Sequence, residues 1–348
     1  MCYTASLTMA SSTVKLENSP AMQFLISSRE PLTKTHNSIS SPELTDYDSL
    51  PEFLKHNEFI LSYYRSEWPL RKTILSIFSL HNETVNVWTH LIGFIIFFLL
   101  SLYAASISPL GTTNSSSTHF AASNSSTYYS FVPANRTVIE TEPETLPPAI
   151  TRWPFYVYLA GAMFCLLMSS ACHLLSCHSA RTCYLMFRLD YAGISALIVS
   201  SFYPLVYYSF TCNPFFRQLY LSSITVFGSA AVAVSLVPVF DTPQFRPFRA
   251  VLFACMGASG VVPIGHKMMA FGHRPEAVLT TGYEAVMLTF YGIGVMVYAT
   301  RVPERWLPGK FDLAGHSHQL FHVLVVAGAY THYLASLVYL GWREAEGC

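Results

Sequence analysis

The sequence predicts an all-α membrane protein: a bundle of seven transmembrane helices with a cytosolic N-terminus, preceded by a short amphipathic helix. Two observations carry this prediction. Of the 348 residues, 52% are hydrophobic and only 11% are charged, whereas soluble domains usually contain about a quarter charged residues. The charges also cluster between long apolar runs, and seven of these runs each approach the roughly 20 residues that cross a bilayer core.

The part of the chain before the first apolar run divides in two. Residues 1–45 are rich in Ser and Thr and lack the sustained apolar core of a signal peptide, so we expect a disordered cytosolic tail. Residues 46–83 mix aromatic and basic residues. Within them, Ile74 and Phe78 follow a basic pair, a pattern that suits a short amphipathic helix lying at a membrane surface.

The remaining residues, 84–348, are expected to form one transmembrane domain, since the sequence shows no obvious internal repeat. A long extracytosolic loop, 108–152, separates the first two spans. The third and fifth spans contain Pro204 and Pro263, which neighbouring helices in a bundle tolerate. The predicted spans are 84–107, 153–175, 188–211, 217–239, 248–266, 277–299 and 317–340.

Two independent features predict that the N-terminus is cytosolic. In that orientation, eleven Lys and Arg residues flank the spans on the cytosolic side and six lie on the opposite side, as the positive-inside rule requires. The loop after the first span contains three glycosylation sequons, at Asn114, Asn124 and Asn135. Glycans are added only on the lumenal face, which places this loop outside the cytosol.

The net charge argues against a nucleic-acid partner, and the cysteine spacing leaves one possible disulfide open. The formal net charge is zero, so we expect no nucleic-acid partner. The eight cysteines form no CxxC pair. Cys212 and Cys348 lie near span ends, and a disulfide between them remains open.

Polar residues gather at one membrane depth on three of the predicted spans. His173 lies near the cytosolic end of the second span, and Asp190 falls within the first turn of the third. His318 and His322 occupy the first two turns of the seventh span, and their spacing of four residues puts them on one helix face. Ser169 precedes His173 by four residues and shares its face.

Other histidines fit this site less well. His316 would face away from His318, and His332 lies about 15 Å further along the helix axis than His322. His178 is also left out of the predicted site. An alternative remains open in which each interfacial histidine only bonds to a backbone carbonyl.

Three imidazoles with an open fourth position are the ligand set of a catalytic zinc site. His173, His318 and His322 are therefore the predicted metal ligands. Asp190 would hold or deprotonate a water molecule, or would orient a histidine, and the Ser169 hydroxyl would join this network. The alternative for Asp190 is a residue favoured near a helix N-terminus by the helix dipole.

Several stretches of the chain resemble the progestin and adipoQ receptor family, most closely its adiponectin-receptor-like branch and the plant heptahelical transmembrane proteins. The stretches are "SLHNETVNVWTHLIG", "ACHLLSCHS", "RLDYAGISALI" and "RVPERWLPGKFDLAGHSHQLFHVLVVAGA". The resemblance covers about residues 45–348. It implies a seven-helix bundle with a cytosolic N-terminus and a zinc ion held near the cytosolic face by three histidines, with an aspartate and a serine nearby.

The same resemblance links the chain to ceramidase-like amide hydrolysis and to hormone or stress signalling. The leading prediction is a receptor-like protein with a zinc-dependent lipid amidase site, whose partners are membrane lipids such as a ceramide or a fatty acid, and a hormone or protein ligand of unknown identity. The rival is a non-enzymatic receptor in which zinc is structural. A G-protein-coupled receptor is the third alternative, and it requires an external N-terminus.

Overall fold

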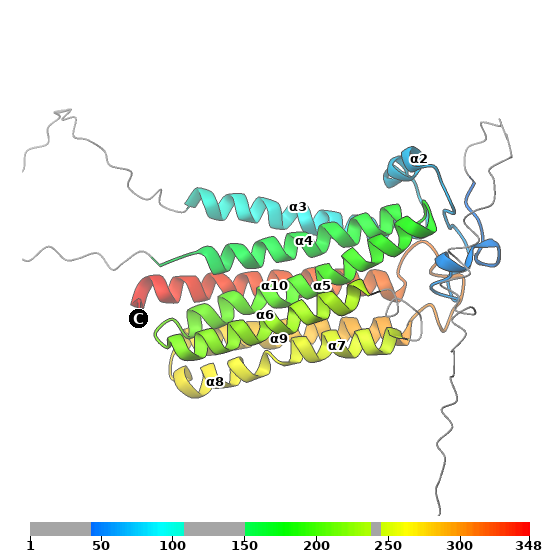
Figure 1. Cartoon of the computed structure of the whole chain (residues 1–348). Helices are drawn as coiled ribbons and strands as arrows, with labels where there is room; N and C mark the ends of the chain where they lie inside the picture. The colour runs from blue at the N-terminus through cyan, green and yellow to red at the C-terminus, as the bar shows by residue number, and fades with distance from the viewer. Residues whose placement is uncertain (1–42, 108–149, 238–244) are drawn as a thin grey trace, which may run out of the picture. The chain divides into compact units, whose positions relative to one another are not determined.

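The computed structural model describes residues 43–107, 150–237 and 245–348. In these residues the regular structure is helical, apart from one isolated bridge between Thr45 and Tyr64. Seven helical stretches here are long and apolar enough to cross a membrane, so the predicted seven-helix class is confirmed (Figure 1). The predicted N-terminal tail, apart from its last three residues, and nearly all of the predicted long loop lie outside the described residues.

The first two spans end where the sequence predicts, but most later helices have shifted ends. The third span starts eight residues before the predicted residue 188, and the seventh continues six residues beyond residue 340, because helical hydrogen bonding persists where the apolar run has stopped. The helices are α3 (Thr84–Ile107), α4 (Trp153–Leu175), α5 (Ala180–Ser209), α6 (Pro214–Leu236), α7 (Arg246–Ala258), α8 (Val261–Phe271), α9 (Pro275–Thr300) and α10 (Ser317–Glu346).

The fifth span is broken, whereas the sequence predicted one continuous helix. It consists of α7 and α8, which meet at Ser259 and Gly260. Pro263 has no N–H group to donate to the carbonyl four residues earlier, at Ser259. Tighter bonds take over at the junction, where Gly260 N donates to Gly257 O at 3.1 Å and Val262 N donates to Ser259 O at 3.2 Å. The helix therefore breaks near the proline and does not continue through it.

The helix α10 packs against several others: it contacts α3, α4, α5 and α9 (Figure 1). Aromatic rings fill the space between the helices. The ring of Phe97 on α3 meets Tyr158 on α4 and Tyr333 on α10 edge to face, with centroids 6.3 and 6.5 Å apart. Close approach also needs small residues, as at Gly161 on α4, where an added Cβ would lie 2.9 Å from the carbonyl oxygen of Ala196 on α5.

The segment before α3 is amphipathic with its apolar side turned outward. It contains a short helix, α2 (Leu70–Leu75), followed by a 3₁₀ turn, η4 (Ser76–Phe78). Thr73 and Ser76 are buried, whereas the large apolar side chains Leu70, Ile74, Leu75, Phe78 and Leu80 are exposed. This arrangement is typical of a helix that rests on a bilayer surface.

Candidate metal centre

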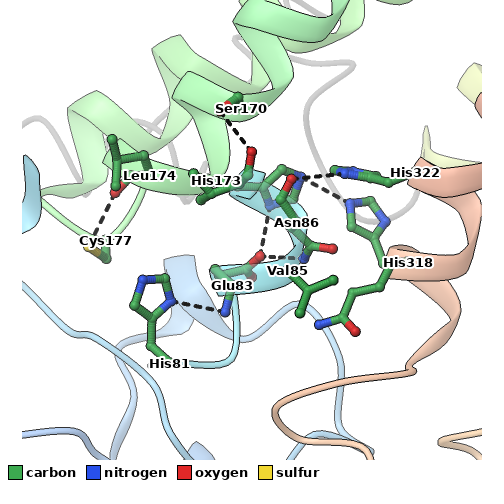
Figure 2. Close-up of polar contacts among 12 residues, drawn as sticks. His81, Glu83, Val85, Asn86, Ser170, His173, Leu174, Cys177, His318 and His322 are labelled. Atoms are coloured by element: carbon green, nitrogen blue, oxygen red, sulfur yellow. Dashed lines mark hydrogen bonds and ion pairs between the residues drawn. The ribbon is translucent and has the colours of Figure 1, made fainter. Parts of the chain in front are cut away.

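Three histidine rings from two helices meet at one point. His173 comes from the last turn of α4, and His318 and His322 come from the first two turns of α10. One ring nitrogen of each lies within 4.8 Å of the others, and the ring centroids are 4.7 to 4.9 Å apart. Figure 2 shows the three side chains converging. This cluster could hold a metal ion.

The spacing of one pair of these nitrogens is close to that of two ligands on a zinc ion. The Nε2 atoms of His173 and His318 are 3.1 Å apart. Ligands at about 2.05 Å from a tetrahedral Zn²⁺ are separated by about 3.3 Å. The donor set, three imidazole nitrogens, also suits a zinc ion.

The C-terminal end of α4 is fixed by Arg65 from the segment before α3. Its guanidinium donates to the carbonyl oxygens of His173 at 2.8 Å and Leu174 at 3.0 Å, and also to Ser76 Oγ. The last carbonyls of a helix have no partner within it. Because Arg65 supplies that partner and is itself buried, it fixes the backbone from which the imidazole of His173 projects.

The N-terminal end of α10 is fixed by Glu304 from the loop before it. The carboxylate accepts a hydrogen bond from the backbone N–H of Ser317 at 2.7 Å and another from the Ser317 hydroxyl. An acidic group is favoured at this position because it satisfies an unpaired N–H and complements the helix dipole. The cap sets where α10 begins and therefore places His318 and His322 in its first two turns.

The start of the first span, together with the residue just before it, supplies the hydrogen-bond partners of two of these histidines. His173 Nδ1 donates to Glu83 Oε2 at 2.8 Å, and Asn86 Nδ2 donates to the same oxygen at 2.5 Å. His322 Nδ1 lies 3.2 Å from the carbonyl oxygen of Asn86 (Figure 2). Such partners fix the tautomer of a ligating histidine and leave its Nε2 for a metal.

Glu83 is held as a carboxylate. Burial would raise the pKa of its side chain, but the attraction and hydrogen bond of His173, with the hydrogen bond of Asn86, lower that pKa well below its usual value. A charged oxygen makes a stronger and more directional acceptor for the imidazole N–H than a neutral one.

A fourth histidine also belongs to this cluster. The ring of His90 on α3 stacks on that of His322, with centroids 3.7 Å apart and planes 7° apart. Sequence reasoning missed Glu83, Asn86 and His90 as parts of the site. A signal was present: their spacing of three and four residues puts them on one helix face, directed at one neighbour.

Ser169 lies one turn before His173 on α4, and Asp190 on α5 is close enough to interact electrostatically with both. The position of Asp190 within its helix differs from the prediction. Asp190 does not lie in the first turn of its helix, because α5 begins at Ala180. The alternative in which the helix dipole favours Asp190 is therefore wrong, since that effect fades within the first turn.

The histidines left out of the predicted site do not join the three rings that converge. His316 is the residue immediately before α10 and is not among the three that converge. His178 Nδ1 donates to the carbonyl oxygen of Trp68 at 2.8 Å. His332 packs edge-on against Tyr158, with ring centroids 4.7 Å apart.

Comparison with known proteins places this arrangement in a family. Residues 78–333 match the family described as haemolysin-III related. The chain belongs to this family. The matched range includes α3, α4 and the start of α10, the three elements that build the histidine cluster, and the predicted resemblance to progestin and adipoQ receptors is confirmed.

Relatives within the haemolysin-III-related family match most of the chain. Heptahelical transmembrane protein 4 of Arabidopsis thaliana is 53% identical over 88% of this chain and 90% of its own length. Heptahelical transmembrane protein ADIPOR3 of Oryza sativa subsp. japonica is 49% identical over 88% and 92%. Adiponectin receptor protein of Drosophila melanogaster is 36% identical over 84% of this chain and 59% of its own length. The protein is thus a seven-span, adiponectin-receptor-like integral membrane protein.

Proposed function

We propose that this member of the haemolysin-III-related family holds a zinc ion on His173, His318 and His322 and hydrolyses a lipid amide of the ceramide type. The observation that carries the proposal is the convergence of three buried or half-buried imidazoles within 4.8 Å. Among the residues that the structure describes, three protein ligands meet there, and zinc sites with three protein ligands are characteristically catalytic rather than structural.

A bound zinc ion would act as a Lewis acid on the amide carbonyl and make water acidic enough to attack near neutral pH. Asp190, which interacts electrostatically with His173, would take the proton of the attacking water as a general base. The Ser169 hydroxyl would orient the Asp190 carboxylate. The C–N bond of the amide breaks, hydroxide adds to the acyl carbon and the proton goes to the amine, giving a fatty acid and a sphingoid base.

The position of the cluster favours a lipid substrate. His322 lies within a membrane span and is buried among α3, α4 and α10. Apolar side chains such as Phe98, Leu99 and Met296 are exposed on the outside of the described helices, where lipid tails replace water. A substrate with two hydrocarbon chains, one acyl and one sphingoid, would reach this depth directly from the bilayer.

We also propose that the N-terminus faces the cytosol, which puts the histidine cluster near the cytosolic face. The excess of basic residues on that side and the three sequons support this orientation. A tag at the N-terminus should resist external protease in intact cells, and a tag after Cys348 should be cleaved. The reverse pattern would refute the orientation and restore the G-protein-coupled alternative. Replacing Asn114, Asn124 and Asn135 should increase gel mobility if the loop is glycosylated.

The metal proposal is tested by elemental analysis of the purified chain. We expect about one zinc per chain, and less in His173→Ala, His318→Ala and His322→Ala. His316→Ala is the matched control, because this histidine is buried close by but does not converge with the others, and it should retain the metal. Equal loss in the control would mean that the wrong histidines were chosen.

The enzymatic proposal is tested by releasing a sphingoid base from a series of ceramides. Asp190→Asn keeps the shape of the side chain and one hydrogen-bonding oxygen but loses the carboxylate, and removing a general base typically lowers the rate about 10²- to 10⁴-fold. Zinc, measured in the same samples, should stay close to wild type. A variant that turns over at the wild-type rate would remove Asp190 from the mechanism.

A receptor with a structural zinc ion is the second candidate. The name of the Drosophila relative, adiponectin receptor protein, favours it, and so does the way the histidines join α4 to α10. This candidate requires that the wild-type chain, loaded with zinc, release no sphingoid base from any ceramide and show no exchangeable water at the metal.

A further inference from the structure

The end of α10 remote from the histidines is anchored by three arginines. Arg343 is buried and donates to the carbonyl oxygens of Tyr208 and Ser209 at the end of α5, the latter at 3.0 Å. Arg152, just before α4, pairs with Glu344 at 2.6 Å. A third pair joins α10 to the residue before α9, where Arg274 contacts Glu346 at 2.9 Å. This end of α10 is therefore docked against three neighbouring helices.

Two thiols meet at the same place. Cys212 lies in the turn between α5 and α6, and Cys348 follows α10 by two residues. Both are exposed free thiols, and they are close enough to interact with each other electrostatically. Arg343 brings the two segments together, because it donates to the carbonyl oxygen of Ser209 at 3.0 Å and also to that of Gly347, at 3.5 Å. One guanidinium thus holds the backbone three residues before Cys212 and the residue next to Cys348.

These two thiols differ from the other cysteines of the described chain. Cys165, Cys172, Cys177 and Cys183 are buried, and Cys255, which is exposed, lies on α7. In the orientation proposed above, α5 and α10 both end on the extracytosolic side, the side on which disulfides form and persist.

We propose that Cys212 and Cys348 form a disulfide, a covalent clasp that ties the end of α10 to the turn between α5 and α6. The clasp rests on the proposed orientation but not on zinc or on amide hydrolysis. Because α10 carries His318 and His322 at its other end, the clasp would restrict sliding of the helix that supplies two of the three histidines.

The chemistry is thiol–disulfide exchange with a small or protein disulfide of the oxidising compartment. The thiolate of one cysteine attacks a sulfur of that disulfide and releases its first thiol. The second cysteine then attacks the mixed disulfide and releases the other thiol. Cys212 and Cys348 together lose two electrons and two protons, and the incoming disulfide is reduced to two thiols.

The direct test is mass spectrometry of protein whose free thiols are blocked before the membranes are broken. Trypsin cuts after Arg188, Arg217 and Arg343, which releases residues 189–217 and 344–348, each with one cysteine. We expect these two peptides joined without reduction and separate after reduction. Recovery of both peptides with blocked thiols before any reduction would overturn the clasp.

Labelling of intact cells with a membrane-impermeant maleimide separates the clasp from the orientation on which it rests. It is done on the Cys255→Ser chain, so that this exposed thiol does not contribute. We expect labelling of Cys212 and Cys348 only after an impermeant reductant. Labelling without reductant would leave the orientation standing and overturn the clasp. Labelling only after permeabilisation would place both thiols in the cytosol and overturn both.

A single substitution distinguishes a bond between the two cysteines from separate capping by a small thiol. In Cys212→Ser, Cys348 has lost its partner and should label without reductant. If it remained blocked, each cysteine would carry its own cap and the clasp would be wrong. Zinc content of Cys212→Ser should match wild type, because the clasp lies at the opposite end of α10 from the histidines. Failure of the clasp therefore leaves the metal proposal untouched.

Discussion

Glu83 provides the most specific test of how the candidate metal centre is built. Its carboxylate oxygen accepts the Nδ1 proton of His173 at 2.8 Å and a proton of Asn86 at 2.5 Å. The hydrogen bond keeps the His173 proton on Nδ1, so that Nε2 faces the other histidines. Removing such a partner typically lowers metal affinity about 10- to 100-fold, which is about 1.4 to 2.7 kcal/mol of binding free energy.

Replacing Glu83 by Gln and by Ala should lower the zinc affinity by different amounts within this range. Glu83→Gln can keep an oxygen where both donors point but loses the charge, so we expect about a tenfold loss of zinc affinity. Glu83→Ala loses the oxygen as well and leaves His173 free to rotate or change tautomer, and we expect about a hundredfold loss.

The assay is competition for zinc between the purified chain and a chromophoric chelator at fixed pH. Glu52→Gln is the matched control: it removes the same charge from a side chain that is 89% exposed and pairs with Lys55, and it should bind zinc like wild type. If Glu83→Ala bound zinc within about twofold of wild type, His173 would not need this partner, and the role assigned here to Glu83 would be wrong.

Three further predictions concern stability, each measured by thermal unfolding in detergent. Lys267 donates to Glu284 at 2.8 Å inside the membrane, and both side chains are buried. Lys267→Met should therefore cost about 3 to 5 kcal/mol by leaving an unpaired buried charge, whereas Lys267→Met with Glu284→Gln should regain most of this. Burial lowers the pKa of His81 to about 4, so the unfolded chain takes up a proton between pH 6.5 and 4 that folded His81 does not. Stability should fall with pH in that window by up to about 1.4 kcal/mol per pH unit from this residue, and His81→Gln should flatten the slope. Gly161→Ala should cost about 1 to 3 kcal/mol, because the new Cβ lies 2.9 Å from the Ala196 carbonyl oxygen.

Each of these predictions has an outcome that contradicts it. If the double variant at Lys267 and Glu284 were no more stable than Lys267→Met, the unpaired charge of Glu284 would not be the cause of the destabilisation. A pH profile of His81→Gln that superimposes on wild type would mean that other groups set the slope. For Gly161, the control is Gly341→Ala on α10, whose new Cβ meets no other atom within 4 Å. Helix propensity favours Ala over Gly, so Gly341→Ala should not destabilise the chain, and equal destabilisation in both variants would mean that the contact at Gly161 is not the cause.

The candidate site could be predicted in part because two of its features are local. His318 and His322 are four residues apart, and the pitch of an α-helix alone puts them on one face. The depth of His173 follows from counting along an apolar run whose length the bilayer sets. These arguments need no knowledge of which helices are neighbours.

Other parts of the site could not be predicted, since they depend on which helices touch. Glu83 and His173 are ninety residues apart in the chain, and no spacing rule links a residue before the first span to one at the end of the second. Arg65 reaches the carbonyl of His173 across a similar separation.

By itself the sequence determined the number of spans, their places to within a few residues for most, and the three histidines that come together, because bilayer thickness and helix pitch act on short stretches of chain. The tertiary structure alone decided that α7 and α8 are separate, that Asp190 lies three turns into its helix, and that Glu83, Asn86 and His90 complete the site. Those features depend on which hydrogen bonds are lost or gained between segments, and such competition is settled only when the helices pack.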